Sequence, residues 1–281
     1  MDLELHMHPF NNLLEDIVHA MDSRKIGILA VESLDASIFP RVRAAAKSLY
    51  SNLIIDDAGV KLPSGKTIWN GREYSTSEGF HLLTIGYSLD TRPYTEIRRI
   101  IDISLKHNAQ VILDHGFVDN NLTRTAGHIS RESEFELNDL CKEYRKEIAL
   151  EWNAYCKPWM RASLLLILNA LGHKTRYYDV NKKVVELSKS INNFYGPTQT
   201  KLLPILTGTD LHAIQRKMLE LMGTARVKAD VQGESPSEIL ASFKELVRAG
   251  KYENTYDYVG FVHLLEAFCL PKLFFKDYQG L

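Results

Sequence analysis

Short apolar segments with strand character alternate with segments of helical periodicity along almost the whole chain, and this order limits the folds available to it. The segments between the strands place apolar residues three and four positions apart, as amphipathic helices do. Strands that alternate with helices predict βαβ units and a mostly parallel sheet. The expected strands cover residues 2–8, 25–33, 79–87, 109–116, 148–155, 174–180 and 202–210.

The repeated units also predict how the sheet closes. Roughly seven of them follow one another without a linker or a change in composition, which favours one α/β domain over residues 1–281 with a closed or nearly closed barrel. An open, doubly wound sheet is the competing architecture. Residues 57–78 break the rhythm and are expected to form a loop that carries small strands. The aromatic segment 252–281 is expected to be helical and to pack on the barrel, with self-association as the alternative.

Composition and charge limit the possible partners. The 281 residues are 45% hydrophobic and 25% charged, which is typical of a globular protein with a substantial core. The formal net charge of -1 argues against a broad surface for nucleic acid or anionic membrane. Three cysteines fit neither a disulfide framework nor a zinc finger, and the first residues do not form a signal peptide. We therefore expect a cytoplasmic protein with a small-molecule partner, no nucleic-acid polymer and no membrane, in an oligomeric state that the sequence does not indicate.

Histidines and acids gather at the ends of the expected strands. His6 and His8 are two residues apart, so they project from the same face of a strand, and Asp210 and His212 do the same if the strand continues that far. His115 also ends a strand, and Glu32 and Glu151 lie at or near strand ends. In parallel α/β barrels the carboxyl ends of the strands form the floor of the active site. Imidazoles and carboxylates together are ligands for zinc, manganese or iron, so the pattern favours a metal site.

Each histidine also has an ordinary explanation, because a single histidine at a strand edge is more often a core or surface residue. Two paired motifs at separate strand ends, with His115 between them, favour ligands instead. The histidines in helical segments are expected to be solvated or capping residues: His19, His107, His173 and His263. The chain has no Walker loop, Rossmann fingerprint or Gly-x-Ser-x-Gly elbow, so nucleotide cradling and serine hydrolysis have no support.

The order of these motifs resembles that of the PHP (polymerase and histidinol phosphatase) superfamily of metal-dependent hydrolases over about the first three quarters of the chain. The opening His-x-His and the closing Gly-x-Asp-x-His are the more specific parts of this resemblance. The matching runs are LELHMH, Gly71-Arg72-Glu73, HLLTIGY, VILDHGF, EWNAY and GTDLH.

The resemblance implies a distorted (β/α)7 barrel that holds two or three divalent metal ions (Zn, Mn or Fe) and hydrolyses phosphate esters. The metal ligands that it implies are His6, His8, Glu73, His81, His115, Asp210 and His212. Glu73 and Asp210 would bridge metals or orient the water, and His128 is a further catalytic candidate. Cationic residues for the phosphate are expected in the irregular segments, and the candidates are Lys66, Arg72, Arg124, His128 and Arg131.

Two departures from the family pattern leave alternatives open. Ser33 stands where the family has a histidine, so Glu32 is expected to replace that ligand or to support the others. Leu13 and Leu14 stand where many members have an Asp or His. An amide hydrolase at the same metals, and a binding module whose metal cluster has decayed, are therefore the competing functions.

Overall fold

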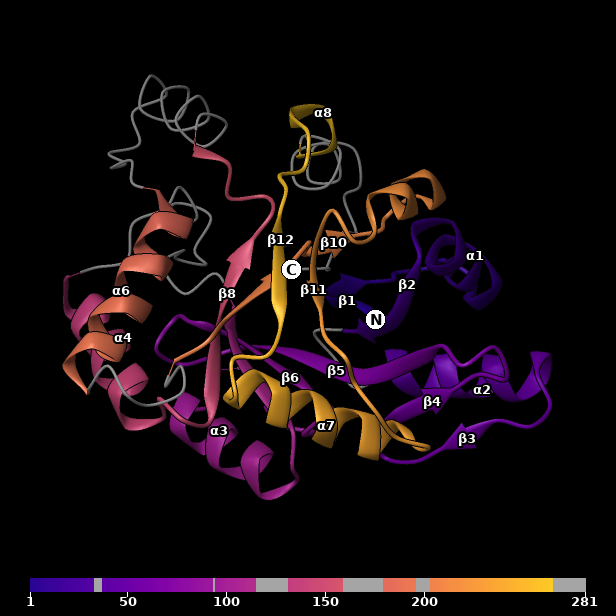
Figure 1. Ribbon diagram of the computed structural model, residues 1–281, viewed down its shortest axis with the longest axis horizontal. Coiled ribbons are helices and arrows are strands. Elements are labelled where there is room, and N and C mark those ends of the chain that lie inside the picture. Colours follow the sequence, from indigo (N-terminus) through magenta and orange to yellow (C-terminus); the bar gives the residue numbers. More distant parts are fainter. Residues whose placement is uncertain (33–36, 93, 115–130, 159–178, 196–202, 265–281) are drawn as a thin grey trace.

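The strands of the protein form one sheet that curls into a nearly closed barrel, shown for the computed structural model in Figure 1. The structure describes residues 1–32, 37–92, 94–114, 131–158, 179–195 and 203–264. Nine strands follow one another around the barrel in the order β12-β11-β1-β2-β5-β6-β7-β8-β9. They are β1 (Asp2–His8), β2 (Ile26–Val31), β5 (Thr67–Ser75), β6 (His81–Ile85), β7 (Gln110–Asp114), β8 (Ile148–Asn153), β9 (Ile205–Gly208), β11 (Ala225–Lys228) and β12 (Glu253–Tyr256). The prediction of a barrel-shaped α/β fold is confirmed.

Two strands, β6 and β11, run opposite to the other strands of the barrel. The pairs β1–β2, β2–β5, β7–β8 and β8–β9 are parallel, whereas β6 is antiparallel to both β5 and β7. Strand β11 is antiparallel to β1 and carries β12 beside it. Two shorter strands, β3 (Ile54–Ile55) and β4 (Gly59–Lys61), extend the sheet beside β5, and β10 (Leu211–His212) pairs in parallel with the end of β1.

Side-chain hydrogen bonds draw the two ends of the sheet together. Asn254 in β12 donates through Nδ2 to the backbone carbonyl of Ile205 in β9, at 2.8 Å. Thr207 in β9 donates back to Asn254 Oδ1, at 3.4 Å. Because β9 and β12 are the last strands of the path, these contacts bring the barrel close to closure without a regular ladder of backbone bonds.

The interior of the barrel is an apolar core to which strands all around the sheet contribute. Its fully or almost fully buried residues include Leu5, Trp69, Leu83, Ile112 and Leu206. Burial of such side chains stabilises the fold by roughly 1.5–3 kcal/mol each.

One end of the barrel is covered by helix α7 (Pro236–Arg248). It begins with a capping box between Ser235 and Glu238, as the SPSE sequence predicts. Its Phe243 packs on Trp69 at 5.6 Å between ring centroids and belongs to the interior core. Helix α7 therefore closes one end and leaves the opposite end for the site.

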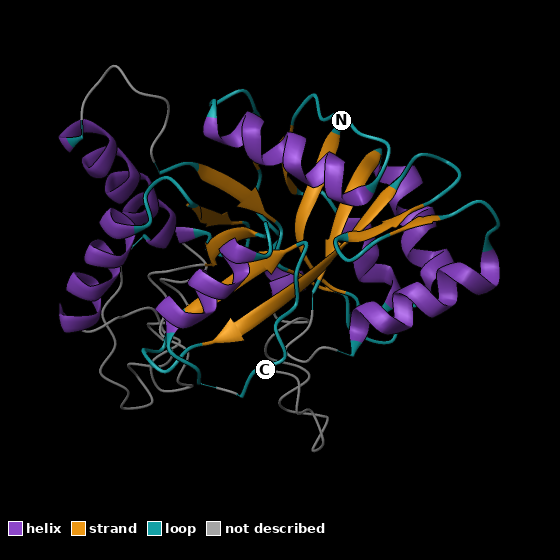
Figure 2. Ribbon diagram, turned by 90° about the horizontal axis from the view of Figure 1, so that it is seen from below, coloured by secondary structure: helices purple, strands orange, loops and turns teal. Residues whose placement is uncertain are grey.

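The remaining helices surround the strands, as Figure 2 shows. Helices α1 (Leu14–Arg24), α2 (Ile38–Leu49) and the 3-10 helix η1 (Arg216–Leu221) share one hydrophobic cluster with β1 and β2. Helices α3 (Ile97–Lys106), α4 (Arg131–Glu143) and α6 (Val180–Phe194) share another with β6, β7 and β8. Helix α8 (Phe261–Leu264) follows β12. Within the described residues, we find no helix with the length and apolar character needed to cross a membrane.

Two sequence-based expectations about these elements are wrong in part. Residues 57–78 do carry a small strand, β4, which pairs antiparallel with β5, but the expected loop is largely replaced by β5, which is nine residues long and lies between β2 and β6. Asn70 and Gly71 interrupt its apolar alternation, and Gly71 is needed there because an added Cβ would lie 2.6 Å from Glu32 Cγ. Within the segment 252–281 that was expected to be helical, residues 253–256 form strand β12 because they pair with β11, residues 261–264 form helix α8, and residues 265–281 lie outside the described residues. Most of the expected strand 174–180 lies outside the described residues, and Val180 begins α6.

Candidate metal centre

The ionisable side chains gather at the end of the barrel opposite α7. His8 and Asp114 are the last residues of β1 and β7, Glu32 directly follows β2, and Asp210 follows β9. His81 is the first residue of β6, and it reaches the same end because β6 runs in the opposite direction. The carboxyl ends of the parallel strands thus supply the site, as the position of active sites in such barrels predicts.

Local backbone features turn the side chains of the His-x-His and Asp-x-His motifs toward one another. Strand β1 has a register shift between Glu4 and Met7 against β2, and irregularities of this kind redirect side chains beside active sites. Asp210 has a φ of +53°, a left-handed conformation that Asp tolerates better than most residues. Gly208 allows close approach, because an added Cβ would overlap the Glu151 carboxylate and lie 3.1 Å from His6 Cβ. The GTDLH motif therefore begins with glycine because the neighbouring side chains leave no room for a Cβ atom there.

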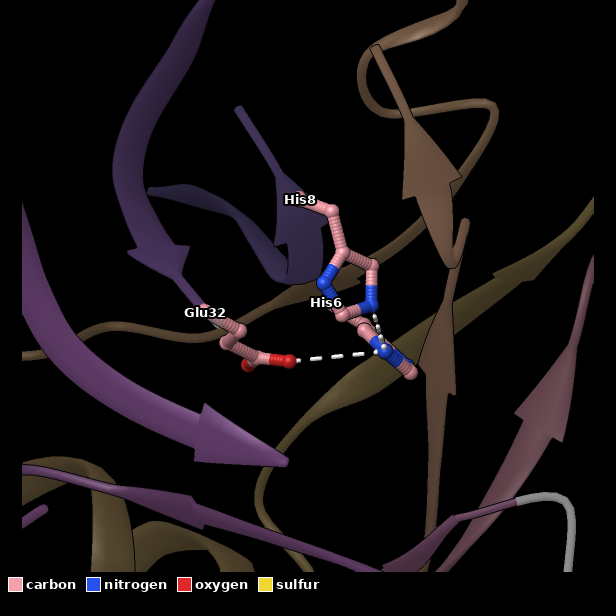
Figure 3. A group of neighbouring side chains, drawn as sticks. All are labelled: His6, His8 and Glu32. Carbon is pink, nitrogen blue, oxygen red and sulfur yellow. Dashed lines mark hydrogen bonds and ion pairs between the residues drawn. The ribbon is translucent and has the colours of Figure 1, made fainter. Parts of the chain in front are cut away.

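His6 lies beside both His8 and Glu32 (Figure 3). Its Nε2 is 3.1 Å from His8 Nε2, so at most one of these two nitrogens carries a proton. The same His6 nitrogen is 3.4 Å from Glu32 Oε2 and 3.4 Å from Asp210 Oδ1. These polar atoms converge on one small volume, and His6 and Glu32 are 0% and 1% exposed.

The closing motif adds a second group beside His8. His212 Nε2 is 3.0 Å from Asp210 Oδ1, and the His8 and His212 rings are 4.6 Å apart. Strand β10 produces this contact, because its pairing with β1 sets His212 directly beside His8. The structure therefore brings the His-x-His and Asp-x-His motifs together.

A third group joins β5, β6 and β7. Glu73 Oε2 is 3.4 Å from His8 Nε2, and Glu73 Oε1 contacts His81 Nδ1. Asp114 lies between the two imidazoles, at 3.6 Å from His6 Nδ1 and 3.9 Å from His81 Nδ1. Glu73 and Asp114 are 4% and 0% exposed, so both carboxyl groups are withdrawn from water.

Buried neighbours orient the candidate ligands. His6 Nδ1–H donates to Glu151 Oε1 at 2.8 Å, which leaves Nε2 as the ligand atom. Asn153 Nδ2 donates to both Glu151 Oε2 and Asp210 Oδ2, each at 3.0 Å. Asn181, in the first turn of α6, exchanges two hydrogen bonds with the backbone of Asn153. This chain of contacts fixes Asp210 Oδ1 toward the imidazoles.

The cluster contains more carboxyl groups than imidazoles, so ionised acids would outnumber the positive charges available to balance them. Burial, with Glu73 and Glu151 nearby, raises the pKa of Glu32 well above its ordinary value, although His6 opposes this. Burial and Glu151 likewise raise the pKa of Asp114. Burial by itself lowers the pKa of His6, but Asp210, Glu32 and Glu151 together raise it well above its ordinary value. The carboxyl groups repel one another and compete for the positive charge that the imidazoles carry.

Burial and the adjacent His212 lower the pKa of His8 to about 3. For Glu73, burial would raise the pKa, but the contact with His81 lowers it well below its ordinary value. For Glu151, burial again opposes ionisation, and His6 brings the pKa down to about 2. A neutral His8 beside an ionised Glu73 is the pair of ligand states that a divalent cation requires.

The residues present fit divalent cations. Both carboxylate oxygens of Glu32 are buried without a hydrogen-bond donor in the described part of the chain, which is costly for a charged group unless a cation balances it. Three groups place their ligand atoms within 4.8 Å of one another: His6, His8 and Glu32; His8, Asp210 and His212; His6, Glu73 and Asp114. His6 and His8 each belong to two groups, but a neutral imidazole offers one lone pair, so each of these histidines would ligate one ion at a time.

Other residues that the sequence singled out lie elsewhere. Lys66 pairs with Asp22 of α1 at 2.5 Å, at the start of β5, so it does not join the cluster. The Arg72 side chain projects from the face of β5 opposite to that of Glu73. It donates to the Leu89 carbonyl, and its guanidinium group packs over the Tyr74 ring. His115, Arg124, His128 and Ser33 lie outside the described residues, as does the side chain of Arg131, the first residue of α4.

Sequence reasoning missed part of the cluster. It chose His115 at the end of its strand and passed over Asp114, although Gln110, Ile112 and Asp114 share one face of β7 by simple alternation. It noted Glu151 as a strand-end acid but gave neither Glu151 nor Asn153 an orienting role. The alternation along EWN, in which Glu151 and Asn153 share a face, was the available signal.

Comparison with known proteins supports the fold. No protein family model matches the chain, and no curated protein matches its sequence. The structure of PsfC from Pseudomonas syringae PB-5123 is similar, with a TM-score of 0.53 and 12% identity over 94% of each chain. The lesion-specific endonuclease PfuEndoQ from Pyrococcus furiosus has a TM-score of 0.49 and 12% identity, over 90% of this chain and 57% of its own. The likeness to PsfC, at 12% identity, shows a shared fold alone, and the resemblance to the PHP superfamily stays a prediction.

One expectation about partners is corrected by these structures. A structure of Endonuclease Q in complex with a 27-mer duplex substrate is also similar, with a TM-score of 0.45 and 13% identity over 87% of this chain and 56% of that one. The expectation that excluded a nucleic-acid polymer is therefore wrong. It rested on the net charge of -1, which reports the balance of the whole chain and not the field at the site.

Proposed function

We propose that this protein is a metal-dependent hydrolase that cleaves phosphate esters at the buried cluster of His6, His8, Glu73, Asp210 and their neighbours. The observation that carries the proposal is the convergence of imidazoles and carboxylates from β1, β5, β7 and the β9–β10 turn on one small volume. A domain with a purely structural role has little use for so many buried acids, because each costs free energy when it is left uncompensated.

Two or three divalent ions (Zn, Mn or Fe) would be held by the ligand atoms of these three groups, with His6 and His8 each ligating one ion. When bound, such ions favour the deprotonation of water and neutralise charge that develops on phosphoryl oxygens. Glu32 takes part in the first group and stands in for the histidine that the resemblance expects at Ser33. His115, at a position that the resemblance also gives as a ligand, remains a candidate.

The side chains of the chain itself position the reactants. Asp210 Oδ1, fixed by Asn153 and 3.0–3.8 Å from the nitrogens of His212 and His8, accepts hydrogen bonds from an attacking water. Glu73, between His8 and His81, is the second acceptor. The apolar core beneath the cluster keeps bulk water out of the barrel, so these carboxylates act in a low-dielectric setting.

The test is hydrolysis by the full chain after metal removal and reloading with zinc, manganese or iron. We expect metal-dependent cleavage of an aryl phosphate and at least a 100-fold lower rate for His8→Ala, since His8 belongs to two of the groups. His19→Ala is the matched control, because His19 is exposed on α1 and should leave the rate unchanged.

The substrate panel separates the alternatives. It includes an aryl phosphomonoester, a phosphodiester, a DNA duplex with an abasic lesion and a cyclic amide. Cleavage of the amide alone would replace the phosphoesterase with an amide hydrolase. A protein that retains less than one equivalent of metal by elemental analysis and hydrolyses nothing would be a binding module, and the proposal would be abandoned.

A further inference from the structure

The turn that follows β1 holds an aromatic residue in an unfavourable backbone conformation. Phe10 has a φ of +48°, in the left-handed region that favours Gly and Asn and is uncommon for a bulky side chain. Conformations of this kind are strained and gather at functional sites. The fold therefore holds the Phe10 side chain in place at some expense in stability.

The turn is tied to both histidine motifs. Asn12 Nδ2 donates to the Pro9 carbonyl at 3.0 Å and to the carbonyl of Ala213, the residue after His212. The Ala213 N–H donates in turn to the His8 carbonyl at 3.0 Å. Because these bonds link the turn to β10, the position of Phe10 is fixed relative to His8 and His212 together.

The Phe10 ring stands at the outer side of this imidazole pair. Its centroid is 6.3 Å from that of His8 and 6.0 Å from that of His212, with interplanar angles of 53° and 38°. His8 and His212 are 6% and 4% exposed, whereas Phe10 is partly exposed. The ring thus borders the cluster where a group attached to a bound phosphate would emerge toward solvent.

We propose that Phe10 is a substrate-contacting residue that gives the site a preference for phosphate esters of planar, aromatic groups. This inference rests on the proposed function and adds the substrate class. An aromatic face beside a phosphate site offers offset stacking to an aryl or heteroaryl group, a contribution that adds to simple burial. A residue needed only to cover the imidazoles would not require a ring, and a residue needed only for the turn would be Gly or Asn.

Binding of phosphonates tests the preference without any hydrolysis. We would titrate the zinc-loaded full chain by calorimetry with phenylphosphonate, cyclohexylphosphonate and methylphosphonate. Phenylphosphonate is expected to bind about 3- to 10-fold more tightly than cyclohexylphosphonate, which is of similar size but not planar. Equal affinities for these two ligands in the wild-type protein would overturn the inference, and this comparison needs no variant to fold.

Two variants then assign the preference to the ring. Phe10→Leu should bind phenylphosphonate and cyclohexylphosphonate equally while its zinc content and methylphosphonate affinity stay unchanged, and Phe10→Tyr should keep the preference. Phe194→Leu is the control, because Phe194 is 80% exposed at the end of α6 and contacts only a neighbouring tyrosine ring among its described ring contacts. A full preference in Phe10→Leu would overturn the role of Phe10.

The failure of this inference differs from that of the proposed function. If phosphonates bind and aryl phosphates are hydrolysed without discrimination between planar and non-planar groups, only the role of Phe10 is lost. If no phosphonate binds and no ester is hydrolysed, the proposed function fails and the inference fails with it.

Discussion

Glu4 offers the sharpest test of how the His-x-His and Asp-x-His motifs are held together. It is 0% exposed and accepts four hydrogen bonds from three different segments. Its Oε1 accepts from the N–H groups of His6, at 3.2 Å, and Thr209, at 3.1 Å. Its Oε2 accepts from the Thr209 hydroxyl, at 2.5 Å, and from the N–H of Gly223, at 2.8 Å. One carboxylate thus joins β1 to the residue before Asp210 and to the start of β11.

The substitution Glu4→Gln keeps the shape and changes the chemistry. The amide group must replace one of the two oxygens, so at least one backbone N–H faces an NH2 group in place of an acceptor. An orphaned buried donor costs about 1–3 kcal/mol, and the remaining bonds lose the extra strength of an ionised acceptor. We expect a loss of about 2–4 kcal/mol in the free energy of unfolding.

The assay is equilibrium unfolding in urea, with the metal-free proteins at pH 8. This pH is above the value of about 7 to which burial raises the pKa of Glu4, so the wild-type carboxylate is mostly ionised. Glu15→Gln on the exposed surface of α1 is the control and should change stability by less than about 0.5 kcal/mol. A loss below about 1 kcal/mol for Glu4→Gln would refute the reasoning. The same variant should bind zinc about 10-fold more weakly, because Asp210 shifts relative to His6.

Three further results are expected. Gly208→Ala should lose about 1–3 kcal/mol of stability in urea unfolding, since its Cβ would overlap Glu151; an unchanged midpoint would contradict the packing. Asn153→Ala should lower zinc affinity about 10- to 100-fold in a chelator competition, because Asp210 loses its orienting donor, and unaltered affinity would exclude that role. Burial lowers the pKa of Lys244 from 10.5 to about 8, so above pH 8 the unfolded chain keeps a proton that the folded one has lost. Stability should therefore rise by ~1–2 kcal/mol between pH 8 and 10.5, and Lys244→Met should flatten that rise.

The sequence predicted the parts of the site that depend on period and strand order. His6 and His8 share a face because strands alternate, and parallel strands deliver their last residues to one end of a barrel. That reasoning is enough to expect His8 near Asp210, although more than 200 residues separate them in the chain.

Other features depend on tertiary contacts that no local pattern contains. Strand β5 was missed because Gly71 weakens its apolar pattern, and Gly71 is explained only by the approach of Glu32. The positions of the Lys66 and Arg72 side chains could not be predicted either. A cationic side chain outside a regular pattern pairs with an acceptor that the tertiary fold places nearby, and the sequence does not show which acceptor that is. For Lys66 that acceptor is Asp22 of α1, which is 44 residues away.

The barrel interior has two layers, and their relation explains why the cluster can exist. On β7 the core residue Ile112 is followed two positions later by Asp114, and on β8 Ala149 is followed by Glu151. The same alternation that points an apolar side chain inward also points the next acid inward, one layer closer to the open end. Burial of the apolar layer offsets the free-energy cost of burying the acids, and the same layer separates those acids from bulk water. Cations at the ligand layer would then stabilise the folded chain by their binding free energy, so ion content and fold stability are coupled through these strands.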